Sequence, residues 1–110
     1  MNIQIFGKAK CFDSKKAERY FNERRIRYQY IDIIKFGMSR GELKSVTKTI
    51  GLDEIVNRED QDYPLYQYLA SDEAKLEKLY EIPELIRTPV VRNGRQATVG
   101  YRPEIWKDWE

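Results

Sequence analysis

Residues 2–33 constrain the fold most strongly, because they have the pattern of a strand, a helix and a second strand in close succession. Residues 2–6 alternate polar and apolar side chains, residues 7–10 have the composition of a loop, and helical character begins at about Phe12. Residues 28–33 form the second predicted strand. Two strands joined by a crossover helix lie parallel, so this pattern predicts a βαβ unit and an α/β fold.

A predominantly helical stretch follows this unit. Ser39 and Glu42 have the spacing of a capping box, and the helix that they open ends at Gly51. Further predicted segments follow along the chain: a helical turn at residues 52–56, a polar surface loop at 57–62, a weaker helix at 63–69 and a helix that begins at 71–73. We therefore expect a helical insertion over residues 37–84.

The predicted helices place apolar side chains three and four residues apart, the spacing of a buried helix face. The expected core positions are Ala17, Tyr20, Phe21, Leu43, Val46, Ile50, Leu52, Ile55, Val56, Leu65, Tyr68, Leu69, Leu76, Leu79, Tyr80, Ile105, Trp106 and Trp109.

The C-terminal part of the chain predicts a hairpin and a final helix. Two strand-like segments, residues 89–92 and 95–101, flank Asn93-Gly94, a pair that is typical of a type I′ turn. Pro103 then occupies the first position of a helix. The order βαβ, helical insertion, ββα predicts one domain over residues 1–110.

Cys11 lies where the first predicted strand gives way to the helix. A thiol at that junction is close to the unpaired N–H groups and the positive end of the helix, which stabilise a thiolate. Because the thiolate is the nucleophile, the position makes Cys11 a candidate catalytic residue. The alternative is an inert thiol that serves as a small core residue.

The composition excludes several kinds of site. The chain of 110 residues contains no histidine and one cysteine. Histidine-based triads, histidine metal sites, Cys-x-x-Cys zinc sites and internal disulfides are therefore excluded, and we expect no metal. The absence of a disulfide framework favours a cytoplasmic location.

Charge and hydropathy limit the partners. The net charge is +2, and the densest basic stretch, residues 24–27, lies at the expected end of the first helix, where cations complement the helix C-terminus. We therefore expect no direct contact with nucleic acid. No apolar run approaches the ~20 residues needed to span a bilayer, and the first residues lack the order of a signal peptide, so we expect no membrane association.

Three local features and a segment of the helical insertion resemble a known family. Cys11-Phe12-Asp13-Ser14 follows the first strand as a C-x-x-S sequence, as in monothiol glutaredoxins and arsenate reductases, and Thr88-Pro89 stands where thioredoxin-like folds carry a cis-proline. Residues 52–58 and 95–104 are similar to the helical subdomain and the closing hairpin of the ArsC family. The resemblance extends over residues 3–109. It implies a thioredoxin-like, glutaredoxin-like fold: a mixed four-stranded sheet flanked by helices, with an inserted helical subdomain.

The resemblance also implies a site. Cys11 matches the nucleophile of the glutaredoxin-coupled arsenate reductases, and Ser14 matches a hydroxyl three residues after it. Three arginines match those that hold the oxyanion in the reductases: Arg58, Arg87 and Arg102. The alternative is that these arginines only make weak surface ion pairs and that Ser14 only caps the first helix.

The implied activity is that of a thiol-dependent oxidoreductase. Cys11 would attack an oxyanion such as arsenate or the sulfur of a disulfide. With one cysteine the chain cannot resolve its own adduct, so an external thiol must act as reductant, either glutathione as a co-substrate or a glutaredoxin-like partner. We expect no bound cofactor. The chain departs from the reductases at Phe12, where they have glycine, and at Asp13, which adds a negative charge beside the thiol.

Two alternatives stay open. The same family includes the Spx regulators, which bind RNA polymerase and generally use a Cys-x-x-Cys pair as a redox switch. The missing second cysteine excludes that switch, but a non-enzymatic protein-binding module, including one that contacts RNA polymerase, stays open. The second alternative is a glutathione-binding, glutaredoxin-like protein that does not act on arsenate.

Overall fold

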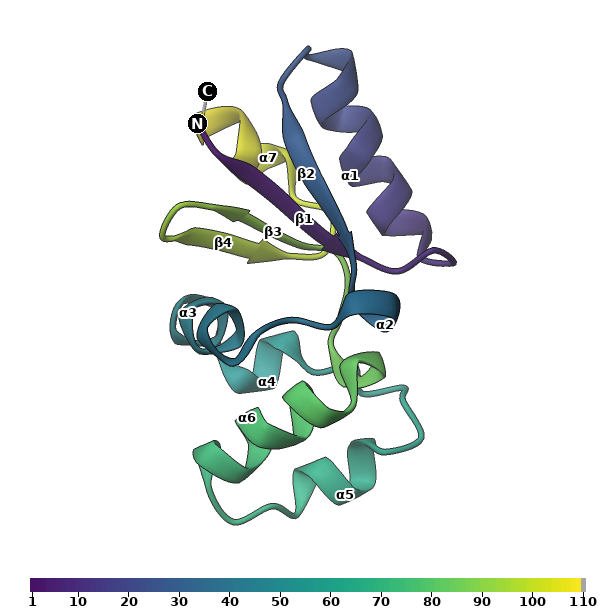
Figure 1. Cartoon of the computed structure of the whole chain (residues 1–110), viewed down its shortest axis with the longest axis vertical. Coiled ribbons are helices and arrows are strands. Elements are labelled where there is room, and N and C mark those ends of the chain that lie inside the picture. Colours follow the sequence, from purple (N-terminus) through teal and green to yellow (C-terminus); the bar gives the residue numbers. More distant parts are fainter. Residues whose placement is uncertain (110) are drawn as a thin grey trace.

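The computed structural model describes residues 1–109 and contains one mixed sheet of four strands in the order β2-β1-β3-β4 (Figure 1). The strands are β1 (Ile3–Gly7), β2 (Tyr28–Asp32), β3 (Val90–Asn93) and β4 (Gln96–Val99). β1 pairs in parallel with β2 and antiparallel with β3, and β3 pairs antiparallel with β4. The expected βαβ unit and hairpin are both confirmed.

Helices α1 (Phe12–Glu23) and α7 (Pro103–Trp106) cover one face of this sheet. A short 3-10 helix, η2 (Lys107–Trp109), continues α7. The buried side chains on this face come from the two helices and from alternate positions of β1 and β3: Ile3, Ile5, Ala17, Tyr20, Phe21, Val91 and Trp106. Because successive side chains of a strand point to opposite faces, the residues between these positions lie on the other face of the sheet.

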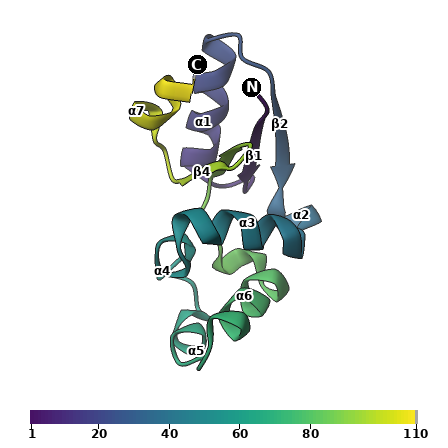
Figure 2. The same cartoon turned by 90° about the vertical axis from the view of Figure 1, so that its left-hand side faces the viewer.

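The remaining helices lie between β2 and β3 in sequence and gather beyond one end of the sheet (Figures 1 and 2). They are α2 (Ile33–Phe36), α3 (Arg40–Ile50), α4 (Leu52–Ile55), α5 (Tyr63–Gln67), α6 (Asp72–Glu81) and the 3-10 helix η1 (Pro83–Leu85). The capping box is present: Ser39 Oγ accepts the Glu42 N–H at 3.1 Å, and the Glu42 carboxylate accepts the Ser39 N–H at 3.0 Å. Among residues 1–109, no helix is both long and apolar enough to cross a membrane.

A second hydrophobic core joins this helical part to the sheet. Phe6, Val90 and Val99 contribute from the strands. The helical part contributes Ile33, Met38, Leu43, Val46, Ile55, Val56, Tyr66, Leu79, Leu85 and Ile86. The helices therefore share a continuous core with the sheet, although the molecule is elongated, with extents of 43 × 26 × 23 Å.

The second strand ends one residue earlier than predicted. Asp32 is the last strand residue, and its Oδ1 accepts the N–H groups of Ile34 and Lys35 at 3.0 and 3.2 Å. This cap begins α2, which the sequence pattern did not predict. A carboxylate that accepts two N–H groups of the first helical turn stabilises the helix. The chain therefore turns into α2 at Ile33 and does not continue as a strand.

Several predicted core positions are wrong. Four of the side chains are exposed: Leu65, Tyr68, Tyr80 and Ile105. On α5 the buried residue is Tyr66, whose hydroxyl donates to the carbonyl oxygen of Leu52 at 3.1 Å. α5 ends at Gln67, so the predicted helical face does not continue to Tyr68. Val56 is buried as expected, but it is extended and pairs with Ile86 rather than belonging to a helical turn.

The hairpin turn also differs from the prediction. Asn93 pairs with Gln96, so Gly94 and Arg95 are the two loop residues. Only Gly94 of these two has a positive φ, at 62°. Glycine at the first central position is the arrangement of a type II′ turn, whereas type I′ requires positive φ at both positions.

Two leucines of the helical part provide a matched test of the packing. Leu79 is 0% exposed and Leu65 is 55% exposed. We expect Leu79→Ala to lower the free energy of unfolding by about 2–5 kcal/mol, because it leaves a cavity in the shared core. Leu65→Ala should change it by about 0.5 kcal/mol or less. Urea denaturation of both variants measures the difference, and equal losses would contradict the packing described here.

Candidate functional site

Cys11 is the residue that precedes helix α1, and its backbone is extended, with φ −86° and ψ 117°. The side chain is half-buried, and its Sγ lies 3.5 Å from the carbonyl oxygen of Thr88, to which the thiol donates. The Thr88–Pro89 peptide bond is cis, as the resemblance implied. The loop before α1 and the loop before β3 therefore meet at the thiol.

The surroundings of Cys11 favour the thiolate. Burial by itself raises the pKa of the thiol, but hydrogen bonds from the side chains of Ser14 and Thr88 and from the backbone N–H groups of Ser14 and Asp13 outweigh it, so the pKa of Cys11 is lowered. Because this pKa is lower in the folded protein than in the unfolded chain, ionisation favours folding. That contribution is complete above the ordinary pKa of a thiol and is lost as the pH falls through the lowered value.

Ser14 holds the loop that carries the thiol. Its side chain is buried, and its Oγ accepts the backbone N–H of Lys8 at 3.3 Å. A Cβ atom at Gly7 would lie 2.8 Å from Ser14 Oγ and 2.8 Å from the Tyr30 hydroxyl, so a larger residue would have to displace one of these side chains. Ser14 is the third residue of α1 and Cys11 occupies the N-cap position, so Ser14 is not the N-cap of this helix.

Lys8 connects the thiol loop to the end of the helical part. Its Nζ donates to the carbonyl oxygens of Glu84 and Ile86 at 3.0 and 2.7 Å. Burial lowers the pKa of Lys8, while the charges of Cys11, Asp60 and Glu84 oppose that shift. The sequence indicated only the charge of this lysine, since its two acceptors lie more than seventy residues away along the chain.

A hollow of about 520 Å³ opens over the thiol. Its lining residues come from the loop before α1, from the segment after α4 and from both ends of the hairpin: Lys8, Lys10, Cys11, Asp13, Asn57, Glu59, Arg87, Thr88 and Gly100. The lining thus carries three cations and two carboxylates. Asn57, Glu59 and Gly100 were not predicted as lining residues, although Asn57 and Gly100 lie in the segments 52–58 and 95–104 that resemble the family.

The three predicted arginines have different surroundings. Arg87 lines the hollow, and its Nη1 donates to the Glu54 carbonyl oxygen at 2.8 Å and lies 3.8 Å from the Glu54 carboxylate. Arg58 is exposed, with its guanidinium carbon 5.9 Å from the centre of the Tyr63 ring. Arg102 donates from Nε to the carbonyl oxygen of Val99 at 3.3 Å. Among the residues described, only Arg87 of the three lines the hollow, and the roles of all three remain predictions.

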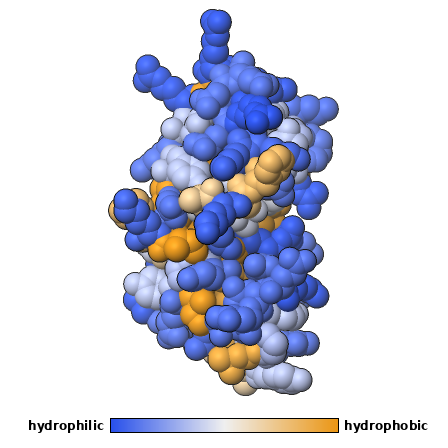
Figure 3. All heavy atoms as spheres, turned by 90° about the vertical axis from the view of Figure 1, so that its right-hand side faces the viewer, coloured by the Kyte–Doolittle hydropathy of each residue, from blue (hydrophilic) through white to orange (hydrophobic). Residues whose placement is uncertain are grey.

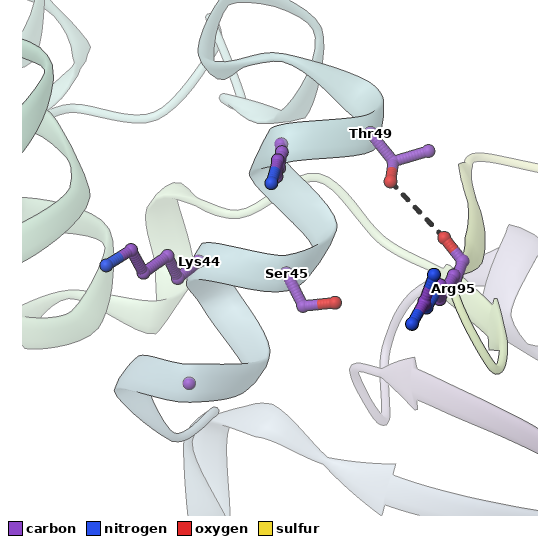
Figure 4. Close-up of a pocket in the computed structure, with 6 residues that line it drawn as sticks. Lys44, Ser45, Thr49 and Arg95 are labelled. Carbon is purple, nitrogen blue, oxygen red and sulfur yellow. Dashed lines mark hydrogen bonds between the residues drawn. The ribbon is translucent and has the colours of Figure 1, made fainter.

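A larger hollow, of about 790 Å³, lies between α3 and the β3–β4 turn (Figure 4). Its charged lining residues are all cations, Lys44, Lys48 and Arg95, and Thr49 donates to the carbonyl oxygen of Arg95 at 3.3 Å across the gap. It contains no thiol or carboxylate among its lining residues. The nucleophile therefore identifies the smaller hollow as the candidate active site, although the other is larger.

Comparison with known proteins agrees with this arrangement. The model of the ArsC family matches residues 6–109. The chain belongs to the ArsC family. Its fold is accordingly the thioredoxin-like fold of that family.

Relatives of this ArsC family member carry two kinds of name. The global transcriptional regulator Spx 2 of Oceanobacillus iheyensis is 26% identical over 100% of this chain and 94% of its own length. The solved structure of an arsenate reductase from Vibrio cholerae is 26% identical, covers 98% of this chain and 97% of its own, and superposes with a TM-score of 0.84. A putative ArsC family related protein from Bacteroides fragilis has a TM-score of 0.86 at 21% identity, covering 100% of this chain and 98% of its own, which supports the fold alone.

The Ser14 hydroxyl provides a test of the ArsC-family site. We expect Ser14→Ala to raise the pKa of Cys11, because the thiolate loses a hydrogen-bond donor. The measurement is the pH dependence of alkylation by iodoacetamide, followed by mass spectrometry. Ser45→Ala, which removes a hydroxyl from the other hollow, is the matched control. Thr88→Val is a second variant with the same expected direction, and unchanged midpoints in both would refute this account of the thiolate.

Proposed function

We propose that this chain is a monothiol oxidoreductase in which Cys11 is the nucleophile. The observation that carries the proposal is the environment of the thiol. Cys11 precedes a helix of twelve residues, lines a hollow, and has a pKa lowered by hydrogen bonds despite burial. An accessible thiol whose anion is stabilised in this way is suited to attack an electrophilic atom.

The cysteine count determines the order of the reaction. The Cys11 thiolate attacks its substrate and forms a covalent adduct, and a disulfide substrate releases one of its sulfurs as a thiolate that takes up a proton. No second cysteine is present to displace the adduct. An external thiol must therefore attack the adduct and regenerate Cys11, with glutathione or a glutaredoxin-like protein as the reductant.

The charges over the thiol favour a disulfide over an oxyanion. Asp13 and Glu59 oppose the approach of an oxyanion, and two of the three cations are already engaged: Lys8 binds two carbonyl oxygens and Arg87 binds Glu54. A neutral disulfide meets no such repulsion. An oxyanion such as arsenate would depend on Arg87, with Arg58 and Arg102 joining from outside the hollow, to neutralise its charge.

A regulatory role is the second candidate, and the similarity to Spx 2 over the whole chain favours it. In that role the fold binds a protein partner, for which RNA polymerase is the candidate named by the resemblance, and the thiol does not turn over. The two functions differ in their dependence on Cys11. An enzyme requires the sulfur, whereas a binding module keeps its partner without it.

Cys11→Ser tests the enzymatic function. We expect the variant to lose glutathione-dependent reduction of bis(2-hydroxyethyl) disulfide down to the uncatalysed rate, because a hydroxyl cannot replace the thiolate. The free energy of unfolding near neutral pH should change by about 1 kcal/mol or less. Turnover in Cys11→Ser equal to that of the unaltered chain would eliminate the reductase function, and retained RNA polymerase binding in pull-downs would then support the regulatory one.

Arg87→Lys separates the two substrate classes. Lysine keeps the charge but loses the planar fork that grips two oxygens at once. For an oxyanion substrate we expect kcat/KM for arsenate reduction to fall about tenfold, which corresponds to about 1.4 kcal/mol. For a disulfide substrate the same change should alter kcat/KM by less than about twofold. Arg102→Lys serves as the comparison outside the hollow.

A further inference from the structure

Two aromatic rings stand exposed beside the thiol. Phe12 is 71% exposed and Tyr101 is 39% exposed. Each ring directly follows a residue that lines the hollow, since Phe12 follows Cys11 and Tyr101 follows Gly100. The two residues are therefore next to the lining of the hollow along the chain, although neither is part of that lining.

Lys16 joins the two rings into one surface. Its Nζ lies 5.3 Å from the centre of the Phe12 ring and 5.4 Å from the centre of the Tyr101 ring, within the range of a cation–π contact. Phe12 and Lys16 lie one helical turn apart on α1, and Tyr101 reaches them from the segment between β4 and α7. We call Phe12, Lys16 and Tyr101 the aromatic rim.

The aromatic rim is anchored on the hydrophobic core. The Tyr101 ring makes an edge contact with the buried Trp106 ring, with centroids 5.6 Å apart and planes at 84°. An aromatic edge contact of this kind contributes about 0.5–1.5 kcal/mol beyond the area that it buries. Tyr101 is therefore held against the core, and Phe12 is joined to it through Lys16. Aromatic side chains are enriched in the centres of protein interfaces.

The charges around the rim are mostly positive. The segments that carry it contribute four cations, Lys10, Lys15, Lys16 and Arg102, against two carboxylates, Asp13 and Glu104. Within residues 1–109 none of these four cations has a carboxylate within 4.0 Å, whereas Arg40 and Lys78 elsewhere, and Arg87 in the lining of the hollow, do have one. Unpaired cations beside exposed rings are complementary to an acidic partner.

The face that carries the thiol loop offers no large apolar groove. The loop between β1 and α1 projects to the right in Figure 1, and Figure 3 views the molecule from that side. The surface there is mostly hydrophilic, and its apolar groups are separated by hydrophilic atoms (Figure 3). A partner on this face must therefore combine apolar contact with charge, as the aromatic rim does.

We propose that the aromatic rim docks an acidic segment of a protein that carries the disulfide substrate. The inference rests on the proposed function and names the class of its substrate. A small disulfide reaches Cys11 through the hollow without touching the rim, whereas a protein disulfide brings flanking residues onto it. In the exchange, the Cys11 thiolate forms a bond to one sulfur of the partner disulfide, the partner's S–S bond breaks, and the other sulfur leaves as a thiolate.

A single-turnover experiment tests this docking. The probes are two synthetic peptides whose cysteine is joined in a mixed disulfide to thionitrobenzoate, one with flanking aspartates and one with flanking lysines, together with the small disulfide 5,5′-dithiobis(2-nitrobenzoate). Attack by Cys11 on the peptide sulfur releases coloured thionitrobenzoate, and no added reductant is needed. The measured quantity is the second-order rate constant for each probe, normalised to that of the small disulfide.

Phe12→Ala and Phe36→Ala are the matched pair of variants. Phe36 is 72% exposed, close to the 71% of Phe12, but it lies on α2 and does not belong to the aromatic rim. We expect Phe12→Ala to lower the normalised rate for the acidic peptide about fivefold to tenfold and Phe36→Ala to leave it within about twofold. Lys16→Glu should reverse the preference between the acidic and basic peptides.

Different rate measurements would overturn the docking and the proposed function. Equal normalised rates for Phe12→Ala and Phe36→Ala, with rapid release by the unaltered protein, would overturn the docking and leave the thiol chemistry intact. If Cys11→Ser released thionitrobenzoate as fast as the unaltered protein does, or if the unaltered protein released it from none of the probes, the proposed function itself would be overturned. A preference of the unaltered protein for the basic peptide would overturn the acidic character of the partner.

Discussion

The position of the thiol depends on the close approach of Gly7 to Ser14 and Tyr30. Because a Cβ at Gly7 would lie 2.8 Å from both hydroxyl oxygens, any larger residue there would displace the Ser14 or the Tyr30 side chain. The Ser14 hydroxyl, on helix α1, accepts the backbone N–H of Lys8. This hydrogen bond ties the loop between β1 and α1 to the first turn of the helix. Cys11 is consequently held at the start of α1, where two N–H groups and two hydroxyls stabilise its anion.

The features that the sequence predicted correctly are determined by neighbours along the chain. The Ser39–Glu42 capping box, the buried face of α1 and the placement of Cys11 at a strand–helix junction each depend on a few consecutive residues. The family resemblance supplied what local patterns lack, namely the cis peptide bond before Pro89, and it named Arg87, which lines the hollow.

The features that escaped prediction depend on contacts between distant segments. Tyr66 is buried and Leu65 exposed: the Tyr66 ring packs in the shared core and its hydroxyl has an acceptor on Leu52, contacts that helical periodicity does not encode. The hairpin turn moved by one residue because the pairing of β3 with β4 carries Asn93 into the strand. Glu59 and Asn57 line the hollow only because the segment after α4 folds back over the loop before α1.

The two hydrogen bonds of Lys8 join the thiol loop to the connection between the helical part and the sheet. A movement of residues 84–86 away from the sheet would take both acceptors from the ammonium group, which would then no longer be held beside Cys11 by these bonds. By reciprocity, ionisation of the thiol changes how strongly Lys8 holds that connection. The ammonium group that interacts electrostatically with the sulfur is thus held by the backbone of the segment that returns the chain from the helical part to the sheet.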